Sequence, residues 1–142
     1  LEGWARRTFV HVELLKGAHK SPEYLAKYPH GRVPYFESGA NVVFESCAAL
    51  LYLADKFPEK KLAPPAEGGA RAAYYQWIVC AAATLDKPVI DTYFHKVVLP
   101  EEKRRPEVVA EHQPVLAAAL RILEPSLVGK SYLLGESFSA AD

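Results

Sequence analysis

The sequence contains no methionine, two cysteines and no surplus of either charge. Seventeen basic and seventeen acidic residues give a formal net charge of zero, which removes the electrostatic argument for nucleic acid or an anionic membrane as a partner. No uninterrupted apolar run approaches the ~20 residues that a membrane-spanning helix needs. We therefore expect a small-molecule partner, with no nucleic acid and no membrane.

Cysteine is too scarce for several kinds of site. Cys47 and Cys80 lie too far apart for a Cys-x-x-Cys motif, and two cysteines cannot make a disulfide framework or a cysteine-rich zinc site. We interpret both as small buried hydrophobic residues, although a helix N-terminus at Cys47 would also favour a thiolate. Four histidines show no metal-ligand spacing: His11, His30, His95 and His112. We predict no metal, and a reducing cytoplasmic location.

Both ends of the chain have the patterns of interrupted elements. Leu1-Glu2-Gly3 is typical of a helix end with its terminating glycine, and no methionine precedes it. Ser139 and Asp142 have the spacing of a capping box, with Phe138 placed as a hydrophobic staple, at the point where the sequence stops. We therefore expect a fragment that is cut at both ends.

The stretch from Gly31 to Ser46 organises the N-terminal half. Two short apolar runs, 33–36 and 42–44, flank the turn formers of 37–41, which predicts a β-hairpin. Pro34 cannot donate to a strand ladder, so we expect it at a strand start, and the Val33–Pro34 bond is a candidate for a cis peptide. In the cis form the Val33 backbone would face outward, where an extended peptide could pair with it.

A helix is predicted directly after this hairpin, beginning at Glu45-Ser46. Unpaired N–H groups and the positive dipole end of a helix favour a bound carboxylate, and Glu45 could hold an ammonium group beside it. A backbone edge, a carboxylate site and an acidic side chain together fit a small zwitterionic peptide. The simpler alternative is that Glu45 or Ser46 only caps the helix.

The remaining patterns predict two domains. Thr8–Leu15 alternates as a strand does, and Ser21-Pro22-Glu23 predicts the start of a short helix. Residues 58–66 are rich in proline and read as a linker, so we place one domain at 1–57 and an all-helical domain at 67–142. Within the second domain we expect Pro88 to interrupt or kink a long apolar helix, and Pro114 to bend the next helix or to move its start.

The run HKSPEYLAKYPHGRVPYFESGANVVFESCAALLYLADKFP resembles the N-terminal domain of the glutathione S-transferase family. The order Pro-x-Gly-[Lys/Arg]-Val-Pro, hairpin, Glu-Ser and a Tyr-Leu-Ala helix is specific when taken together. The resemblance continues through residues 138–142. It implies an α/β thioredoxin-like N-terminal domain, here without its first strand and helix, followed by an all-α C-terminal domain that is also incomplete.

The resemblance also implies how glutathione would bind. Val33 and Pro34 would pair with its cysteinyl unit, while Glu45 and Ser46 would hold its γ-glutamyl end.

For the glycyl carboxylate, the resemblance points to His19 and Lys20, with Arg32 nearby. A solvated surface is the alternative interpretation of these three side chains. With glutathione as co-substrate, the implied protein is a cytoplasmic, homodimeric transferase that joins the glutathione thiolate to a hydrophobic electrophile in detoxification.

No catalytic residue can be assigned. The family places a Ser, Tyr or Cys at the start of its first helix, a position that would precede Leu1, so we expect the fragment to be inactive. A Cys there would instead indicate a glutathione-dependent reductase, isomerase or dehalogenase. A further alternative is a non-catalytic module for protein contacts, although such members tend to lose the glutathione anchors. Ala82, where bacterial relatives often have a carboxylate, leaves the polar part of a dimer contact open.

Overall fold

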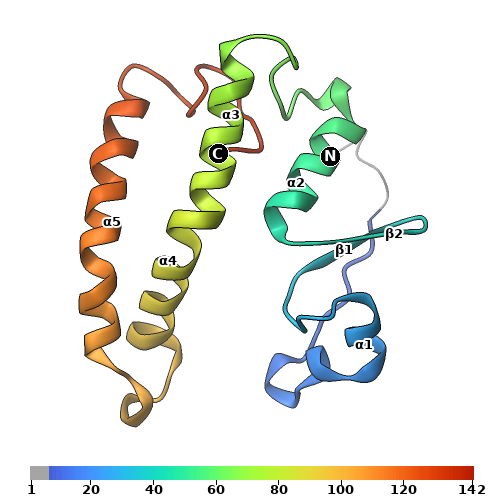
Figure 1. The fold of residues 1–142 in the computed structure, drawn as a ribbon, viewed down its shortest axis with the longest axis vertical. Coiled ribbons are helices and arrows are strands. Elements are labelled where there is room, and N and C mark those ends of the chain that lie inside the picture. The colour runs from blue at the N-terminus through green and yellow to red at the C-terminus, as the bar shows by residue number, and fades with distance from the viewer. Residues whose placement is uncertain (1–6) are drawn as a thin grey trace. The chain divides into compact units, whose positions relative to one another are not determined.

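The computed structural model describes residues 7–142, which fold as two units (Figure 1). The first unit ends at Ala49 and the second runs from Leu50 to Asp142. The helix end expected at Leu1–Gly3 lies outside the described residues. Within residues 7–142, no helix combines the length and the apolar character needed to cross a membrane.

In the first unit short helical segments precede the two strands of the hairpin, and the elements of the second unit are helical. The first unit contains η1 (Leu14–Lys16), η2 (Ala18–Lys20), α1 (Pro22–Lys27), β1 (Tyr35–Ser38) and β2 (Asn41–Phe44). Helix α2 (Ser46–Lys56) begins in the first unit and ends in the second. The second unit continues with η3 (Pro58–Lys60), α3 (Gly69–Cys80), η4 (Ala81–Leu85), α4 (Asp86–Tyr93), η5 (Phe94–Val98), η6 (Glu101–Lys103) and α5 (Pro106–Leu127).

Helix α1 begins as the sequence predicts. The Ser21 side chain accepts a hydrogen bond from the Tyr24 N–H at 3.2 Å, and Pro22 occupies the first turn, where its missing N–H costs nothing. The helix ends at Lys27 because the Tyr28 backbone turns to an extended conformation before Pro29. Tyr24 in the helix and Tyr28 directly after it are buried in the first unit, where they are 8% and 2% exposed.

The predicted β-hairpin is confirmed. Strands β1 and β2 pair antiparallel, with Tyr35 opposite Phe44 and Ser38 opposite Asn41. The two-residue connection begins with Gly39 at φ +62°, a conformation that glycine adopts without strain and that matches the twist of a hairpin. The start of β1 at Tyr35 therefore lies beside the end of β2 at Phe44. The residues before Tyr35 and those after Phe44 leave the ladder at this same end of the hairpin.

The strand predicted at Thr8–Leu15 is wrong for the described structure. Residues 7–13 form no ladder, and a 3₁₀ turn, η1, follows. A strand needs a hydrogen-bonded neighbour, and the sheet of the described residues contains only β1 and β2. Phe9 and Val10 are accordingly 84% and 80% exposed. Alternation alone predicted an extended segment but could not supply its partner.

In the second unit, α3, η4, α4 and η5 form one continuous helical rod that lies beside α5 (Figure 1). Pro88 lacks the N–H that would bond the carbonyl of Thr84, and the π-helical turn η4 precedes it. The rod thus adjusts its hydrogen bonds at the predicted interruption. Helix α5 begins at Pro106 and continues through Pro114, so Pro114 does not set its start.

The segment before α3 is fixed by Arg71. Its guanidinium donates to the Pro64 carbonyl at 2.8 Å and to the Asp55 carboxylate at 2.9 Å, which joins α2, the proline-rich segment and α3. This packing explains why the second unit includes the proline-rich residues and part of α2. The domain limits 1–57 and 67–142 with a linker at 58–66 stay a prediction.

The capping box expected at the end of the sequence forms in part: the Asp142 carboxylate reaches back to the Ser139 N–H, while the Ser139 hydroxyl accepts from the Ala141 N–H at 3.2 Å rather than from that of Asp142. The Asp142 carboxylate accepts from the Ser139 N–H at 2.9 Å and from the Ser139 hydroxyl at 3.0 Å, and it also accepts from the Leu133 N–H at 2.7 Å. Ser139 is only 4% exposed. The box therefore ties the loop at residues 131–136 to the end of the described chain.

Candidate functional site

The loop before Val33 is fixed by two side chains, which we call the carbonyl clamp: Lys20 and Tyr24. The Lys20 ammonium donates to the carbonyls of His30 and Gly31 at 3.3 Å and 2.8 Å, and the Tyr24 hydroxyl donates to the carbonyl of Arg32 at 2.5 Å. Three successive carbonyls are thereby satisfied by side chains. The clamp therefore fixes the chain up to Arg32, directly before Val33, and leaves the Val33 backbone groups outside these hydrogen bonds.

Val33 presents an open backbone at the hairpin end. The Val33–Pro34 peptide bond is cis, and Val33 is 41% exposed. Among the described residues, its N–H and carbonyl have no hydrogen-bond partner. By the register of the hairpin, Val33 leaves the ladder at the same end as Glu45 and Ser46. The predicted backbone edge and the predicted acidic anchor are thus neighbours.

Glu45 has an unusual backbone and a single side-chain partner. Its φ of +67° is rare for a residue other than glycine, and its side chain is exposed. Its Oε1 accepts a hydrogen bond from the Tyr28 hydroxyl at 2.9 Å, and no other partner of this carboxylate lies within residues 7–142. The side chain therefore does not cap α2, which weighs against the simpler interpretation of Glu45.

Tyr28, the hydrogen-bond partner of Glu45, is itself buried and fixed by ring stacking. Its ring is 2% exposed and stacks on Phe44, with ring centroids 4.7 Å apart and an angle of 10° between the planes. Burial raises the pKa of the Tyr28 hydroxyl, and the hydrogen bond to Glu45 raises that pKa further. The hydroxyl consequently stays protonated and able to donate at neutral pH.

Helix α2 begins at Ser46, which is exposed. The Ala49 N–H donates to the Glu45 carbonyl at 3.0 Å and closes the first helical turn. The Ser46 hydroxyl and the start of α2 therefore lie next to the Glu45 carboxylate in the chain. An acceptor for an ammonium group and a helix start suited to a carboxylate are adjacent there.

The residues predicted for the glycyl carboxylate differ in their surroundings. Lys20 uses its ammonium group on the carbonyl clamp, so one of its three N–H groups is left for a ligand. His19 is half-buried and its Nδ1 has no partner in the described part of the chain, while the side chain of Arg32 is exposed. Their role stays a prediction.

Sequence reasoning missed both tyrosines. Tyr24 lies in α1 and Tyr28 directly follows the end of that helix, and the four-residue spacing of the two tyrosines before Pro29 was the available signal. What the spacing could not show was the direction of their hydroxyls, one toward the Arg32 carbonyl and one toward Glu45.

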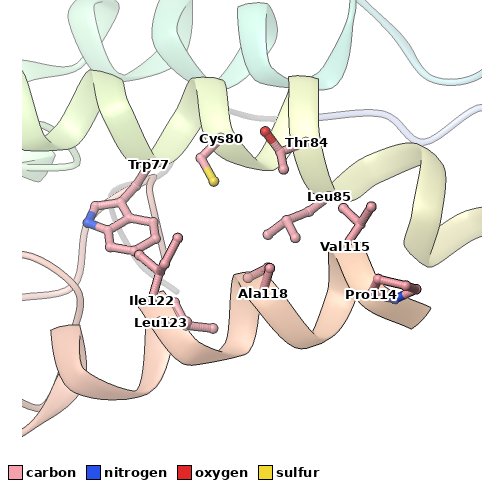
Figure 2. A pocket seen from close by; sticks show the side chains of 10 residues that line it. Trp77, Cys80, Thr84, Leu85, Pro114, Val115, Ala118, Ile122 and Leu123 are labelled. Atoms are coloured by element: carbon pink, nitrogen blue, oxygen red, sulfur yellow. The ribbon is translucent and has the colours of Figure 1, made fainter. Parts of the chain in front are cut away.

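A separate apolar cavity of about 370 Å³ lies in the second unit between the α3–η4 rod and α5. Figure 2 shows Cys80 and Thr84 on one side, with Val115 and Ala118 facing them. Among the described residues, no charged side chain lines it. Within the described residues, no cluster of His, Cys, Asp and Glu has the arrangement of a metal site.

Comparisons with known proteins agree with the resemblance in the sequence. The family described as glutathione S-transferase, N-terminal domain, matches residues 7–55. Glutathione S-transferase F9 of Arabidopsis thaliana is 31% identical over 141 residues, which covers 94% of this chain and 63% of that protein. Glutathione S-transferase theta-1 of Rattus norvegicus is 34% identical over 135 residues, which covers 92% of this chain and 56% of that protein.

Solved structures give the same answer. Glutathione transferase F7 from Populus trichocarpa has a TM-score of 0.81 at 28% identity, over 93% of this chain and 64% of its own. A theta class enzyme from Xanthomonas axonopodis pv. citri, solved with glutathione bound, has a TM-score of 0.78 at 28% identity, over 87% and 59% of the two chains. The chain spans less than two thirds of the length of each of these relatives.

The predicted fold class is confirmed: a thioredoxin-like N-terminal domain with a small antiparallel sheet is followed by a helical C-terminal domain. The chain belongs to the glutathione S-transferase family.

Proposed function

We propose that the protein is a glutathione transferase, which binds glutathione in the first unit and joins its thiolate to a hydrophobic electrophile. The observation that carries this proposal is the pairing of two features at one end of the hairpin. The Val33 backbone has no hydrogen-bond partner among the described residues, and the Glu45 carboxylate is held beside the start of α2 by Tyr28. A γ-glutamyl peptide has the complementary groups.

The three parts of glutathione are assigned as follows. The backbone of its cysteinyl unit pairs with Val33 next to Pro34, as an added strand does. Its ammonium group binds the Glu45 carboxylate, and its γ-glutamyl carboxylate binds the Ser46 hydroxyl and the start of α2.

Its glycyl carboxylate binds the remaining Lys20 N–H, with His19 and Arg32 nearby. A thiolate must then be stabilised by a donor beside its sulfur. Following the resemblance, we assign that donor to a residue before Leu1.

We further propose a cytoplasmic homodimer with a role in detoxification. Exposed apolar side chains on α4 and η5 support a subunit contact, since Val89, Tyr93 and Val97 are 51%, 55% and 59% exposed. Light scattering of the intact gene product tests the dimer. A monomer at micromolar concentration would refute it.

Retention on immobilised glutathione tests the binding site. We expect the protein to be retained and the double variant Glu45→Ala, Ser46→Ala to pass through, because each charge-assisted hydrogen bond contributes roughly 1.5–3 kcal/mol, or about tenfold or more in affinity. The chain offers a matched control, since Glu37-Ser38 is the same dipeptide on the same hairpin. Glu37→Ala, Ser38→Ala should be retained. Equal retention of all three proteins would sink the assigned site.

The reaction type needs a separate assay. The intact gene product should conjugate glutathione to 1-chloro-2,4-dinitrobenzene, followed by absorbance. Reduction of a glutathione mixed disulfide without conjugation would favour the cysteine-type alternative. Binding without either reaction would favour the non-catalytic module.

A further inference from the structure

We propose that Tyr28 is a positioning residue for glutathione: its hydroxyl fixes Oε1 of Glu45, so that Oε2 is left in place for the ammonium group of the ligand. This inference rests on the proposed function, because it concerns the same site. It assigns a role to a residue that would not itself contact glutathione.

Tyr28 can act in this way because its own position is fixed at several points. Its backbone N–H donates to the Tyr24 carbonyl at 2.9 Å, and its carbonyl accepts from the Gly31 N–H at 2.8 Å. Its ring stacks on Phe44 and meets the His30 ring edge-on at 5.9 Å. The hydroxyl therefore cannot follow Glu45 if that side chain moves.

Glu45 needs such a partner because no other hydrogen bond restrains its side chain within the described part of the chain. Its side chain is exposed, and Tyr28 is its only hydrogen-bond partner among residues 7–142. A free glutamate would lose rotamer freedom when it binds the ligand, and ordering one such side chain costs about two- to tenfold in affinity. A carboxylate that is already fixed avoids that loss, which is the benefit of preorganisation.

The variant Tyr28→Phe tests the role, because it keeps the ring and removes only the hydroxyl. Calorimetry should compare glutathione with glutaryl-cysteinylglycine, which lacks only the ammonium group. We expect Tyr28→Phe to lower the affinity for glutathione about two- to tenfold and to leave the affinity for the analogue unchanged. If Tyr28 had a purely structural role, the substitution would lower the affinity for both ligands by the same factor. Tyr35→Phe, which removes a hydroxyl elsewhere on the hairpin, should change neither.

The outcomes separate the inference from the proposed function. If the unaltered protein binds neither ligand, the proposed function fails. If it binds glutathione and Tyr28→Phe leaves the preference over the analogue unchanged, the positioning role of Tyr28 is overturned. The same holds if the unaltered protein has no preference for glutathione, because Glu45 then does not recognise the ammonium group.

A second variant keeps the inference testable if Tyr28→Phe does not fold. Incorporating 3,5-difluorotyrosine at position 28 keeps the side-chain shape and lowers the pKa of the phenol. The preference for glutathione over the analogue should then fall as pH rises through the titration of this phenol, since a phenolate cannot donate to Glu45. A preference with the same pH profile as that of the unaltered protein would contradict the role.

Discussion

Replacing Gly31 with alanine should destabilise the first unit more than the same change at another positive-φ glycine. Gly31 is buried and has φ +57°, and an added Cβ would stand 2.8 Å from the His19 carbonyl oxygen, 2.9 Å from Leu25 Cδ2 and 2.9 Å from Lys20 Nζ. The positive φ costs an alanine about 1–2 kcal/mol, and the forced contacts cost a further ~1–3 kcal/mol. The backbone oxygen cannot move aside cheaply, so we expect about 2–5 kcal/mol in total.

Gly39→Ala is the matched control for this substitution. Gly39 has φ +62° but no atom within 4 Å of the added Cβ, so it reports the backbone cost alone. Urea denaturation followed by circular dichroism gives the free energy of unfolding of both variants. We expect Gly31→Ala to be less stable than Gly39→Ala by about 1–3 kcal/mol. Equal losses would show that residues 19–25 do not pack against Gly31 as described, and the carbonyl clamp would lose its main support.

Two further predictions concern the second unit. Asp91→Ala should lower the free energy of unfolding by about 1–3 kcal/mol, because the buried His112 ring loses the carboxylate partner that it has at 2.9 Å. Lys87→Ala removes an exposed partner of the same carboxylate and should cost less than ~1 kcal/mol. Hydrogen bonds from Lys87 and, second, from His112 lower the pKa of Asp91. The ionised Asp91 therefore stabilises the protein above the unfolded-state pKa of about 3.9, and this stabilisation is lost as pH falls below that value. Identical acid-unfolding curves for the unaltered protein and Asp91→Ala would contradict this. Ser139→Ala should lower the free energy of unfolding by about 1 kcal/mol, because it removes the two hydrogen bonds of the Ser139 hydroxyl, to the Asp142 carboxylate and from the Ala141 N–H; an unchanged melting temperature would refute it.

The local elements could be predicted because their signals are local. Ser21 as a cap, Pro22 in the first turn and the glycine of the hairpin connection each act within a few residues, and the structure has each of them in place. The strand predicted at Thr8–Leu15 failed for the opposite reason. A strand exists only with a partner, and alternation within one segment gives no information about its neighbour.

The chemistry of the candidate site was predicted in part. Glu45, Ser46 and Val33 could be chosen because helix starts and proline-flanked edges have known preferences for anions and peptides. The partner of Glu45 could not be chosen in this way. Tyr28 lies seventeen residues earlier, and its contact depends on how α1 packs against the hairpin. Side-chain direction across such a distance is a property of packing.

Lys20 shows how packing changes the meaning of a charged residue. From the sequence it is a cation for the glycyl carboxylate, yet in the structure two of its N–H groups hold the carbonyls of His30 and Gly31. These two roles are compatible because an ammonium group has three donors. Removing Lys20 would therefore free the loop that positions Val33 and would also remove the proposed contact with the glycyl carboxylate. A loss of affinity in such a variant could not be assigned to the glycyl carboxylate alone, which is why Glu45 and Ser46 are the sharper test of the site.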